Sequence, residues 1–345
     1  MDKDALILKD QVWQPLGKDL FNGDPISELD HAAFTDYYTK QWHIMARHGS
    51  GSRYPVSMRC RDIPKLIRQI QCNKTRAEIV AELKTDQCVN TLLQTEQDYE
   101  NLLNLALRLA SMMKFGAVRR QIMPRRFLEW EQGSFPDFLA KHFGKPPVLS
   151  HDRVRLPKAF HAWNIEKIGG IRICFTDNLA DHLLLVEDDS KLLIFHHVSF
   201  LEYNHNALFP DGLVDEILRT LALLLPEAQF GRRSRGAGRK WLRQTRLREA
   251  DGRVLDMRLA HCGNLQMEER QIEHFTYWRD RLVILKQAYD DATPRTIAQW
   301  WHDRRNGVQW YTFWVAILVL VLTAFLGLVQ CVESALQVYK AYVPS

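Results

Sequence analysis

The sequence contains few cysteines and none of the short motifs that commonly mark an active site. Its six cysteines include no C-x-x-C pair and no spacing typical of a zinc site, so they favour scattered small apolar residues in a reducing compartment. The motifs G-x-S-x-G, G-x-x-x-x-G-K-[ST], G-x-G-x-x-G and H-E-x-x-H are also absent. The sequence therefore offers no catalytic residue, metal ligand or cofactor site, and it favours a protein that is not an enzyme.

The N-terminus lacks the features of a secretory leader. Asp2 and Asp4 lie at its start, and the nearby apolar run is short, whereas a signal peptide has a basic start and about 7–15 apolar residues. Hydrophobic residues make up 46% of the chain and charged residues 25%, which is typical of globular proteins. We therefore expect most of the chain to fold as a body that was not secreted.

Charged residues are absent from residues 310–329, which read WYTFWVAILVLVLTAFLGLV. A helix of about 20 apolar residues crosses a hydrocarbon core of roughly 30 Å. This run predicts a transmembrane helix. Only a short tail follows it, so we expect a single-pass, tail-anchored membrane protein rather than one with a buried core helix.

The flanks of the apolar run predict its orientation. Arg304 and Arg305 precede the run, and Lys340 is the only basic residue after it. The positive-inside rule then places the N-terminal body in the cytosol. The expected membrane-interface residues are Arg304, Arg305, Trp310, Tyr311 and Trp314. A span near 20 residues mildly favours a thinner membrane such as the endoplasmic reticulum.

Two small residues in the run, Thr323 and Gly327, have the small-x-x-x-small spacing that permits close contact between membrane helices. This spacing suggests homo-oligomerisation through the membrane run.

Basic residues are concentrated between residues 231 and 248, where eight lysines and arginines occur without any acidic residue. The glycines within this segment predict a flexible loop. A polybasic segment on the cytosolic side of a membrane attracts anionic lipid headgroups, so we expect it to contact membrane lipid or an acidic protein partner. A solvated loop without a specific role is the simpler alternative, and a membrane anchor argues against nucleic acid. The candidate residues are Arg232, Arg233, Arg235, Arg239, Lys240 and Arg243.

The pattern along the chain predicts an α+β body that is mostly helical and contains a small sheet, followed by one C-terminal transmembrane helix. The expected divisions are a helical region at 1–150, a mixed α/β region at 151–264 with the basic loop 231–248, a helical stem at 265–309, the transmembrane helix at 310–329 and a tail at 330–345.

Helices are predicted from spacing and capping residues. Asn73 is a plausible N-cap, a longer helix is expected over 89–114, and Asp211 can cap a helix that ends before Pro226. Asn264 is expected to open a long helix, followed by a restart at Thr293. One apolar face of that long helix is formed by Ile272, Phe275, Trp278, Leu282, Leu285 and Tyr289.

Short buried strands are predicted at 171–176, 183–186 and 192–195, with a turn at Asp188 and Asp189. The Asp251-Gly252 pair suggests a hairpin between two further short strands.

The adjacent histidines His196 and His197 are expected to be structural. Adjacent residues of a strand face opposite sides of a sheet, so we expect the two rings not to share a metal ion.

Four segments of the sequence resemble a family of uncharacterised membrane proteins of filamentous fungi. They read FTDNLADHLLLVEDD, LLIFHHVSFLE, LVDEILRTLALLLP and WWHDRRNGVQWYTFWVAILVLVLTAFLGLVQCVESALQVYKA. The resemblance covers about residues 168–342 and implies a fungal origin and a single membrane helix. The layout is also similar to CorA-type magnesium transporters, but the second membrane helix and the Gly-Met-Asn motif of that family are absent.

These observations favour a membrane-anchored cytosolic binding or scaffold protein whose partner the sequence does not identify. One alternative is a CorA-like subunit related to divalent-cation transport. Another is a membrane-tethered enzyme that acts on a hydrophobic substrate and needs a deep polar pocket.

Overall fold

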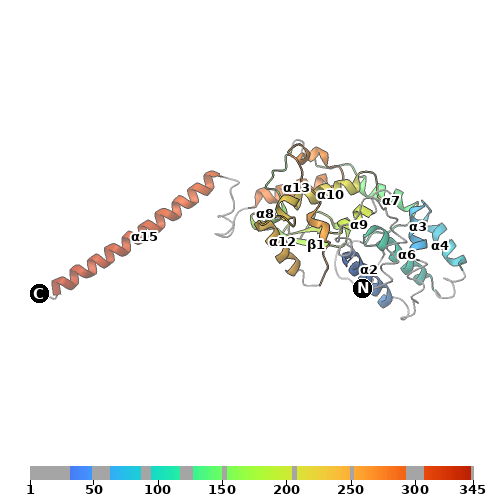
Figure 1. The fold of residues 1–345 in the computed structure, drawn as a ribbon, viewed down its shortest axis with the longest axis horizontal. Coiled ribbons are helices and arrows are strands. Elements are labelled where there is room, and N and C mark those ends of the chain that lie inside the picture. The colour runs from blue at the N-terminus through green and yellow to red at the C-terminus, as the bar shows by residue number, and fades with distance from the viewer. Residues whose placement is uncertain are drawn as a thin grey trace. The chain divides into compact units, whose positions relative to one another are not determined.

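The chain forms two units in a computed structural model. The described residues are 32–48, 63–86, 95–116, 127–149, 154–203, 208–248, 252–292 and 307–342. The first unit, here called the body, comprises Met1–Glu166 and Ile171–Asp291, and the second comprises Lys167–Gly170 and Ala292–Ser345. The body combines helices with one small sheet, and an apolar helix follows near the C-terminus, which confirms the predicted fold class (Figure 1).

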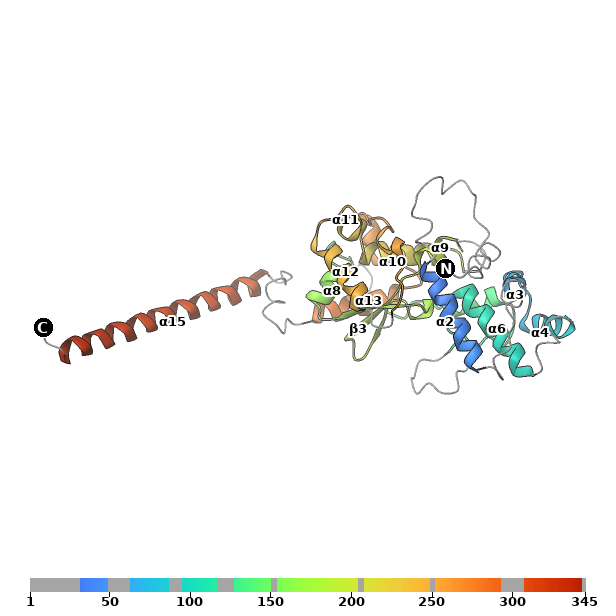
Figure 2. The same cartoon turned by 60° about the horizontal axis from the view of Figure 1, so that its bottom comes forward.

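The described N-terminal part of the body is helical. Its helices are α2 (Ala32–His48), α3 (Ile63–Gln71), α4 (Arg76–Thr85), α6 (Glu96–Ser111) and α7 (Phe135–Phe143). Helix α6 is the core element, since Leu102, Leu103 and Leu105 have no exposed surface. Helices α2 and α3 pack against it (Figure 2). The Tyr37 hydroxyl of α2 also donates a 3.1 Å hydrogen bond to the carbonyl of Arg108.

Capping boxes set the starts of two of these helices. The Thr75 hydroxyl accepts from the backbone N–H of Glu78, whose carboxylate accepts in return from the Thr75 N–H, so Thr75 and not Asn73 is the N-cap of α4. Thr95 and Asp98 form the same box at the start of α6. Helix α6 ends at Ser111, earlier than the predicted end near residue 114, and its C-cap Met112 adopts a left-handed conformation.

The sheet follows the predicted strands. Its strands are β1 (Arg172–Thr176), β2 (Leu184–Val186) and β3 (Lys191–Phe195), in the order β1-β3-β2. β1 pairs parallel with β3, and β2 pairs antiparallel with β3. The predicted turn between β2 and β3 is confirmed, and Glu187, Asp188 and Asp189 all adopt positive φ there.

Helices and short helical turns surround this sheet in the rest of the body. They are α8 (Ala162–Lys167), η2 (Leu179–Asp181), α9 (Val198–Tyr203), α10 (Leu213–Leu224), α11 (Glu227–Phe230), α12 (Ala237–Arg248), η3 (Met257–Ala260), η4 (Glu268–Arg270), η5 (Ile272–His274) and α13 (Arg279–Asp291). The two parts of the body pack together. The ring of Phe143 lies 5.8 Å edge-on from Trp278, and the backbone N–H of Leu179 donates to the carbonyl of Met112.

Two local predictions in this part are wrong. The two short strands expected around Leu247 and over 254–259 are not formed, because Leu247 belongs to α12 and residues 257–260 form the turn η3. Asp211 does not cap α10, whose N-cap is Gly212 with φ of 79°.

The long helix predicted from Asn264 is also interrupted, and a buried carboxylate explains where α13 begins. Glu216 of α10 accepts hydrogen bonds from the backbone N–H groups of Thr276, Tyr277 and Trp278 at 2.7, 3.1 and 2.7 Å. These donors lie just before Arg279, the first residue of α13, where a helix leaves N–H groups unpaired. The six residues of the predicted apolar face are nevertheless all buried.

Helix α15 (Gly307–Tyr342) contains the predicted membrane run. Its segment Trp310–Lys340 is long and apolar enough to cross a membrane, by length and composition. The helix does not end at residue 329, because it continues as a single helix through residue 342. At 1.5 Å per residue, its 36 residues extend about 54 Å, well beyond a hydrocarbon core of roughly 30 Å.

We predict that Glu216→Gln destabilises the body by about 1–3 kcal/mol, because the amide group places its own donors against backbone N–H groups. The free energy of unfolding of the full chain, measured with denaturant in mild detergent, tests this. The matched control is Glu268→Gln, at an exposed position, with an expected change below about 0.5 kcal/mol. Equal stability of the two variants would contradict the assigned role of Glu216.

Candidate functional site

The basic segment forms part of a folded element rather than a flexible loop. Helix α12 covers residues 237–248 and buries Trp241, Leu242 and Thr245, which share one face at i, i+1 and i+4. The ring of Trp241 lies 5.8 Å from that of Phe230 at the end of α11, in an edge-on arrangement. The expectation of a loop is therefore wrong for residues 237–248, because an apolar stripe within the basic sequence anchors them as a helix, whereas residues 231–236 form the connection between α11 and α12.

Gly238 permits the close packing of α12 on α11. A Cβ atom at this position would lie 3.1 Å from the carbonyl oxygen of Gln229 and 3.2 Å from the ring of Phe230. Contacts this short leave little room for a side chain. The glycine thus serves close approach, and not the flexibility expected from the sequence.

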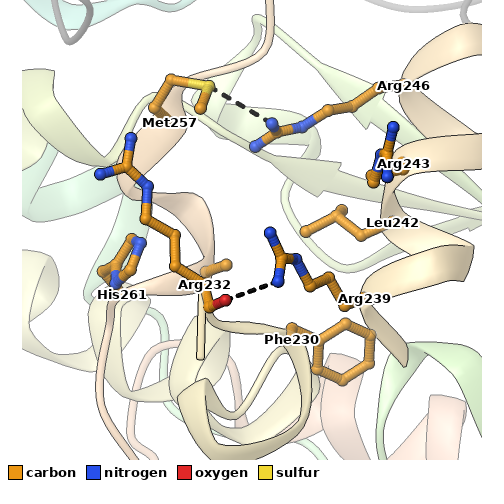
Figure 3. Close-up of a pocket in the computed structure, with 9 residues that line it drawn as sticks. Phe230, Arg232, Arg239, Leu242, Arg243, Arg246, Met257 and His261 are labelled. Carbon is orange, nitrogen blue, oxygen red and sulfur yellow. Dashed lines mark hydrogen bonds between the residues drawn. The ribbon is translucent and has the colours of Figure 1, made fainter. Parts of the chain in front are cut away.

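The exposed side of α12 contributes to a pocket of about 210 Å³ (Figure 3). This basic pocket is lined by Phe230, Arg232, Arg239, Leu242, Arg243, Arg246, Met257, Ala260 and His261. The lining thus has four arginines and no carboxylate. Phe230, Leu242, Met257 and Ala260 supply its apolar surface. The arrangement is an electropositive cavity with apolar walls.

Two arginines of the basic pocket contact weak or neutral acceptors. Arg239 donates to the carbonyl oxygens of Arg232 at 2.6 Å and Ser234 at 3.3 Å. Arg246 lies 3.3 Å from the sulfur of Met257, a weak acceptor, and its buried Nε has no hydrogen-bond partner. Burial lowers the pKa of Arg246, and the charge of Asp256 partly offsets this effect.

Acidic residues near the basic pocket have other partners. Glu227 pairs with His261 at 3.2 Å. The carboxylate of Asp256 accepts from the N–H and hydroxyl of Ser199 and from the N–H of Arg258. The lining itself therefore has no carboxylate, and Asp256 acts on Arg246 from outside the lining.

The structure divides the six sequence-predicted basic residues into two sets. All six are exposed, but only Arg232, Arg239 and Arg243 line the basic pocket, whereas Arg233, Arg235 and Lys240 lie outside its lining. Arg246, which is not among these six, also lines the pocket. Its spacing in the sequence indicates this role, because positions 239, 243 and 246 are four and three residues apart and so share one face of a helix.

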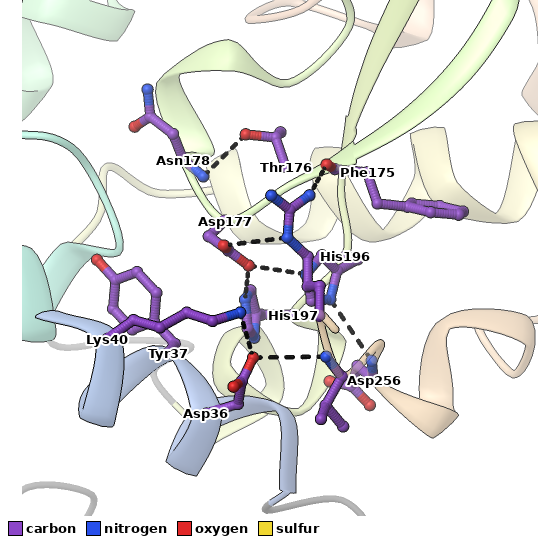
Figure 4. A network of polar contacts seen from close by, with 12 residues as sticks. Asp36, Tyr37, Lys40, Phe175, Thr176, Asp177, Asn178, His196, His197 and Asp256 are labelled. Carbon is purple, nitrogen blue, oxygen red and sulfur yellow. Dashed lines mark hydrogen bonds and ion pairs between the residues drawn. The ribbon is translucent and has the colours of Figure 1, made fainter. Parts of the chain in front are cut away.

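A second polar site lies at the end of the sheet (Figure 4). Asp177 follows β1, and His196 and His197 follow β3; the Oδ1 atom of Asp177 lies 2.9 Å from the Nε2 atoms of both histidines. Arg253 pairs with the other carboxylate oxygen at 3.3 Å. We call these four residues the histidine cluster. The ring of His197 also lies 5.8 Å from Tyr37 of α2.

The strand-alternation argument is wrong for the two histidines. β3 ends at Phe195, so His196 and His197 lie beyond the alternating backbone and both can face Asp177. Their nitrogens and the Asp177 oxygen all lie within 4.8 Å of one another, a grouping that could hold a metal ion. However, His196 Nδ1 accepts from the Asp256 N–H at 3.5 Å, which directs the Nε2 proton of the neutral ring toward Asp177. The contacts of His196 are therefore those of a hydrogen-bonded connection between the Asp177 carboxylate and the backbone of Asp256.

Burial shifts the protonation of this link and of two other histidines. Burial acts to raise the pKa of Asp177, but hydrogen bonds from His196 and His197 outweigh it and hold the pKa well below its usual value. Burial lowers the pKa of His196 to about 3, and the adjacent His197 acts in the same direction. Burial also lowers the pKa of His182 to about 3 and that of His161 to about 4.

The predicted membrane-interface residues fall in two groups. Arg304 and Arg305 lie outside the described residues. Trp310, Tyr311 and Trp314 lie in the first turns of α15, where the two tryptophan rings are 6.2 Å apart.

The small-residue pair lies further along α15. The Thr323 hydroxyl donates to the carbonyl of Val319 at 2.8 Å, so its hydrogen bond is satisfied within the helix. A Cβ atom at Gly327 would meet nothing within 4 Å. The proposed helix–helix contact stays a prediction.

Comparison of the chain with protein-family models, with curated proteins and with solved structures finds no match.

We predict that acidification destabilises the body from about pH 6.5 downward. His161, His182 and His196 have folded pKa values below the unfolded value of about 6.5, so the unfolded chain binds more protons at lower pH. Each should remove about 1.4 kcal/mol from the free energy of unfolding between pH 7.5 and pH 5.5. Denaturant titrations of the full chain in mild detergent at both pH values measure this loss.

A substitution separates this effect from general acid sensitivity. His182→Gln should reduce the loss between the two pH values by about 1.4 kcal/mol, whatever its effect at pH 7.5. The exposed His274→Gln serves as the control and should leave the loss unchanged. A His182→Gln chain with the wild-type loss would contradict the neutral state of this histidine.

Proposed function

We propose that this chain is a membrane-anchored binding or scaffold protein whose body recognises an anionic group on its lipid or protein partner. The observation that carries the proposal is the basic pocket, where four arginines surround one cavity without a lining carboxylate. Charged side chains placed in this way favour binding of an anion.

The anchor is the second support for this proposal. The segment Trp310–Lys340 is apolar enough to cross a membrane, and its uncharged run at 310–329 presents a large area that water disfavours. Insertion into lipid removes that area from water while the helix satisfies its own backbone hydrogen bonds. We assign residues 310–329 to the hydrocarbon region, with Trp310, Tyr311 and Trp314 at one interface.

The proposed orientation places the body in the cytosol. Arg304 and Arg305 precede the span, whereas Lys340 alone follows it. The cytosolic leaflet is rich in anionic lipid, and each basic residue close to such a surface contributes about 1 kcal/mol of binding. The orientation thus brings the basic segment and anionic lipid to the same side, and the length of the span mildly favours the endoplasmic reticulum.

Transport is a less supported function for this chain. The described part contains one helix that is long and apolar enough to span a membrane, whereas a pore needs several. A CorA-like role therefore requires association through α15, for which the small residues Thr323 and Gly327 offer a contact face.

We predict that replacing the six basic residues Arg232, Arg233, Arg235, Arg239, Lys240 and Arg243 by Gln weakens capture of the protein by anionic vesicles at least about tenfold at low salt, since 1.4 kcal/mol corresponds to tenfold. The assay uses full chain in phosphatidylcholine nanodiscs and vesicles that contain phosphatidylserine. Neutral vesicles are the control. Unchanged capture would rule out a role of the basic segment in lipid contact.

We also predict that a glycosylation acceptor appended after Ser345 is modified in cells, because the proposed orientation puts the C-terminus in the lumen. The same acceptor added at the N-terminus should stay unmodified. The reverse pattern would overturn the orientation and with it the access of the body to cytosolic lipid.

A further inference from the structure

We propose that the basic pocket binds one phosphomonoester group, as a discrete site and not as part of a diffuse positive surface; this inference rests on the proposed function. The ligand is either a lipid headgroup that ends in a phosphomonoester or a soluble phosphorylated molecule. Both carry the same dianionic group, which is the chemistry the site would recognise.

The positive charge of the lining is unusual because it is not balanced by ion pairs in the described part of the chain. Neighbouring arginines are paired: Arg248 lies 2.9 Å from Glu166, and Arg258 lies 2.6 Å from Glu202. Among the described residues, none of the four lining arginines makes an ion pair, although three of them share one face of α12. Like charges three or four residues apart destabilise a helix. An anion in the pocket would remove this repulsion.

The guanidinium groups approach the basic pocket from two different segments of the chain. Arg232 approaches from the segment between α11 and α12, and Arg239 and Arg246 approach from α12 (Figure 3). Arg239 donates to the carbonyls of Arg232 and Ser234, so these contacts fix its side chain at the wall of the pocket. A group held from several sides by planar forks is bound with defined geometry.

The charge and the number of acceptor oxygens favour a phosphomonoester over a carboxylate as the bound anion. A phosphomonoester carries a charge of about −1.5 to −2 near pH 7 and presents three acceptor oxygens, enough for several guanidinium groups at once. A carboxylate has one charge and two oxygens and would leave more of the lining unneutralised. Arginine also matches phosphate geometry through two parallel hydrogen bonds.

The volume of the pocket and its apolar walls also favour a small phosphate ester. The volume of about 210 Å³ is below the roughly 300–1,000 Å³ of pockets that hold drug-sized ligands. Such a cavity suits a headgroup-sized ion. Phe230, Leu242, Met257 and Ala260 form walls that fit the carbon part of an ester better than they fit a free hydrated phosphate ion.

The test uses variants with equal charge loss inside and outside the pocket. The pocket variant is Arg239→Gln with Arg243→Gln and Arg246→Gln, and the outside variant is Arg233→Gln with Arg235→Gln and Lys240→Gln. Full chain in phosphatidylcholine nanodiscs is titrated with methyl phosphate by calorimetry. We expect the pocket variant to lose at least about tenfold in affinity and the outside variant less than about twofold.

A second pair of variants guards against misfolding, because Arg246 is partly buried. Arg243 and Lys240 are both exposed on α12, so Arg243→Gln and Lys240→Gln should fold alike. We expect weaker methyl phosphate binding only for Arg243→Gln. Equal losses for these two, or for the two triple variants, would overturn the discrete site while leaving the proposed function intact.

Vesicle capture identifies the source of the phosphate. If the ligand is a lipid, vesicles with phosphatidic acid should capture the wild-type protein more tightly than vesicles with phosphatidylserine, and the pocket variant should lose this preference. If it is soluble, methyl phosphate binds without such a preference. Wild-type protein that shows neither methyl phosphate binding nor a phosphatidic acid preference overturns the inference. Wild-type protein that no anionic vesicle captures contradicts its proposed lipid binding.

Discussion

The long apolar surface of helix α15 is the constraint on which the rest of the structure depends. Its segment Trp310–Lys340 is long and apolar enough to cross a membrane, and its residues 310–329 carry no charge. Water disfavours such a surface strongly, and a bilayer accepts it because a helix needs no external hydrogen bonds. The proposed placement of α15 in lipid, with the body in the cytosol, would bring the body close to a surface that carries anionic headgroups.

The same effect, on a smaller scale, turns a run of positive charge into a site. Trp241, Leu242 and Thr245 bury one face of α12 against the body, and Gly238 allows the close approach to α11. Because that face is fixed against the body, the arginines at 239, 243 and 246, which share a neighbouring face of the helix, line the same pocket. A disordered segment of the same composition would attract anions through charge alone, whereas the folded helix presents a cavity.

The sequence predicted elements that depend on local pattern and missed those set by distant groups. The three strands and the buried positions Ile272 to Tyr289 follow from periodicity and are confirmed. The start of α13 depends on Glu216, about sixty residues earlier, which no local pattern reveals. The charge of the pocket is evident from the sequence, but the apolar positions Trp241, Leu242 and Thr245 are too few to indicate a helix among so many basic residues and glycines, and without that helix nothing places Arg246 beside Arg239 and Arg243. The histidine cluster escaped because β3 ends one residue before His196.

The placement of α15 in lipid is the central claim, and a spin-label scan tests it most directly. Single cysteines are introduced as Leu318→Cys, Leu322→Cys, Phe325→Cys and Tyr342→Cys into an otherwise cysteine-free full chain. Each is labelled with a nitroxide, and the protein is reconstituted in lipid nanodiscs. We predict high accessibility to oxygen and low accessibility to a water-soluble nickel chelate at the first three positions, and the reverse at Tyr342. Equal access of the nickel chelate to all four positions would contradict membrane insertion.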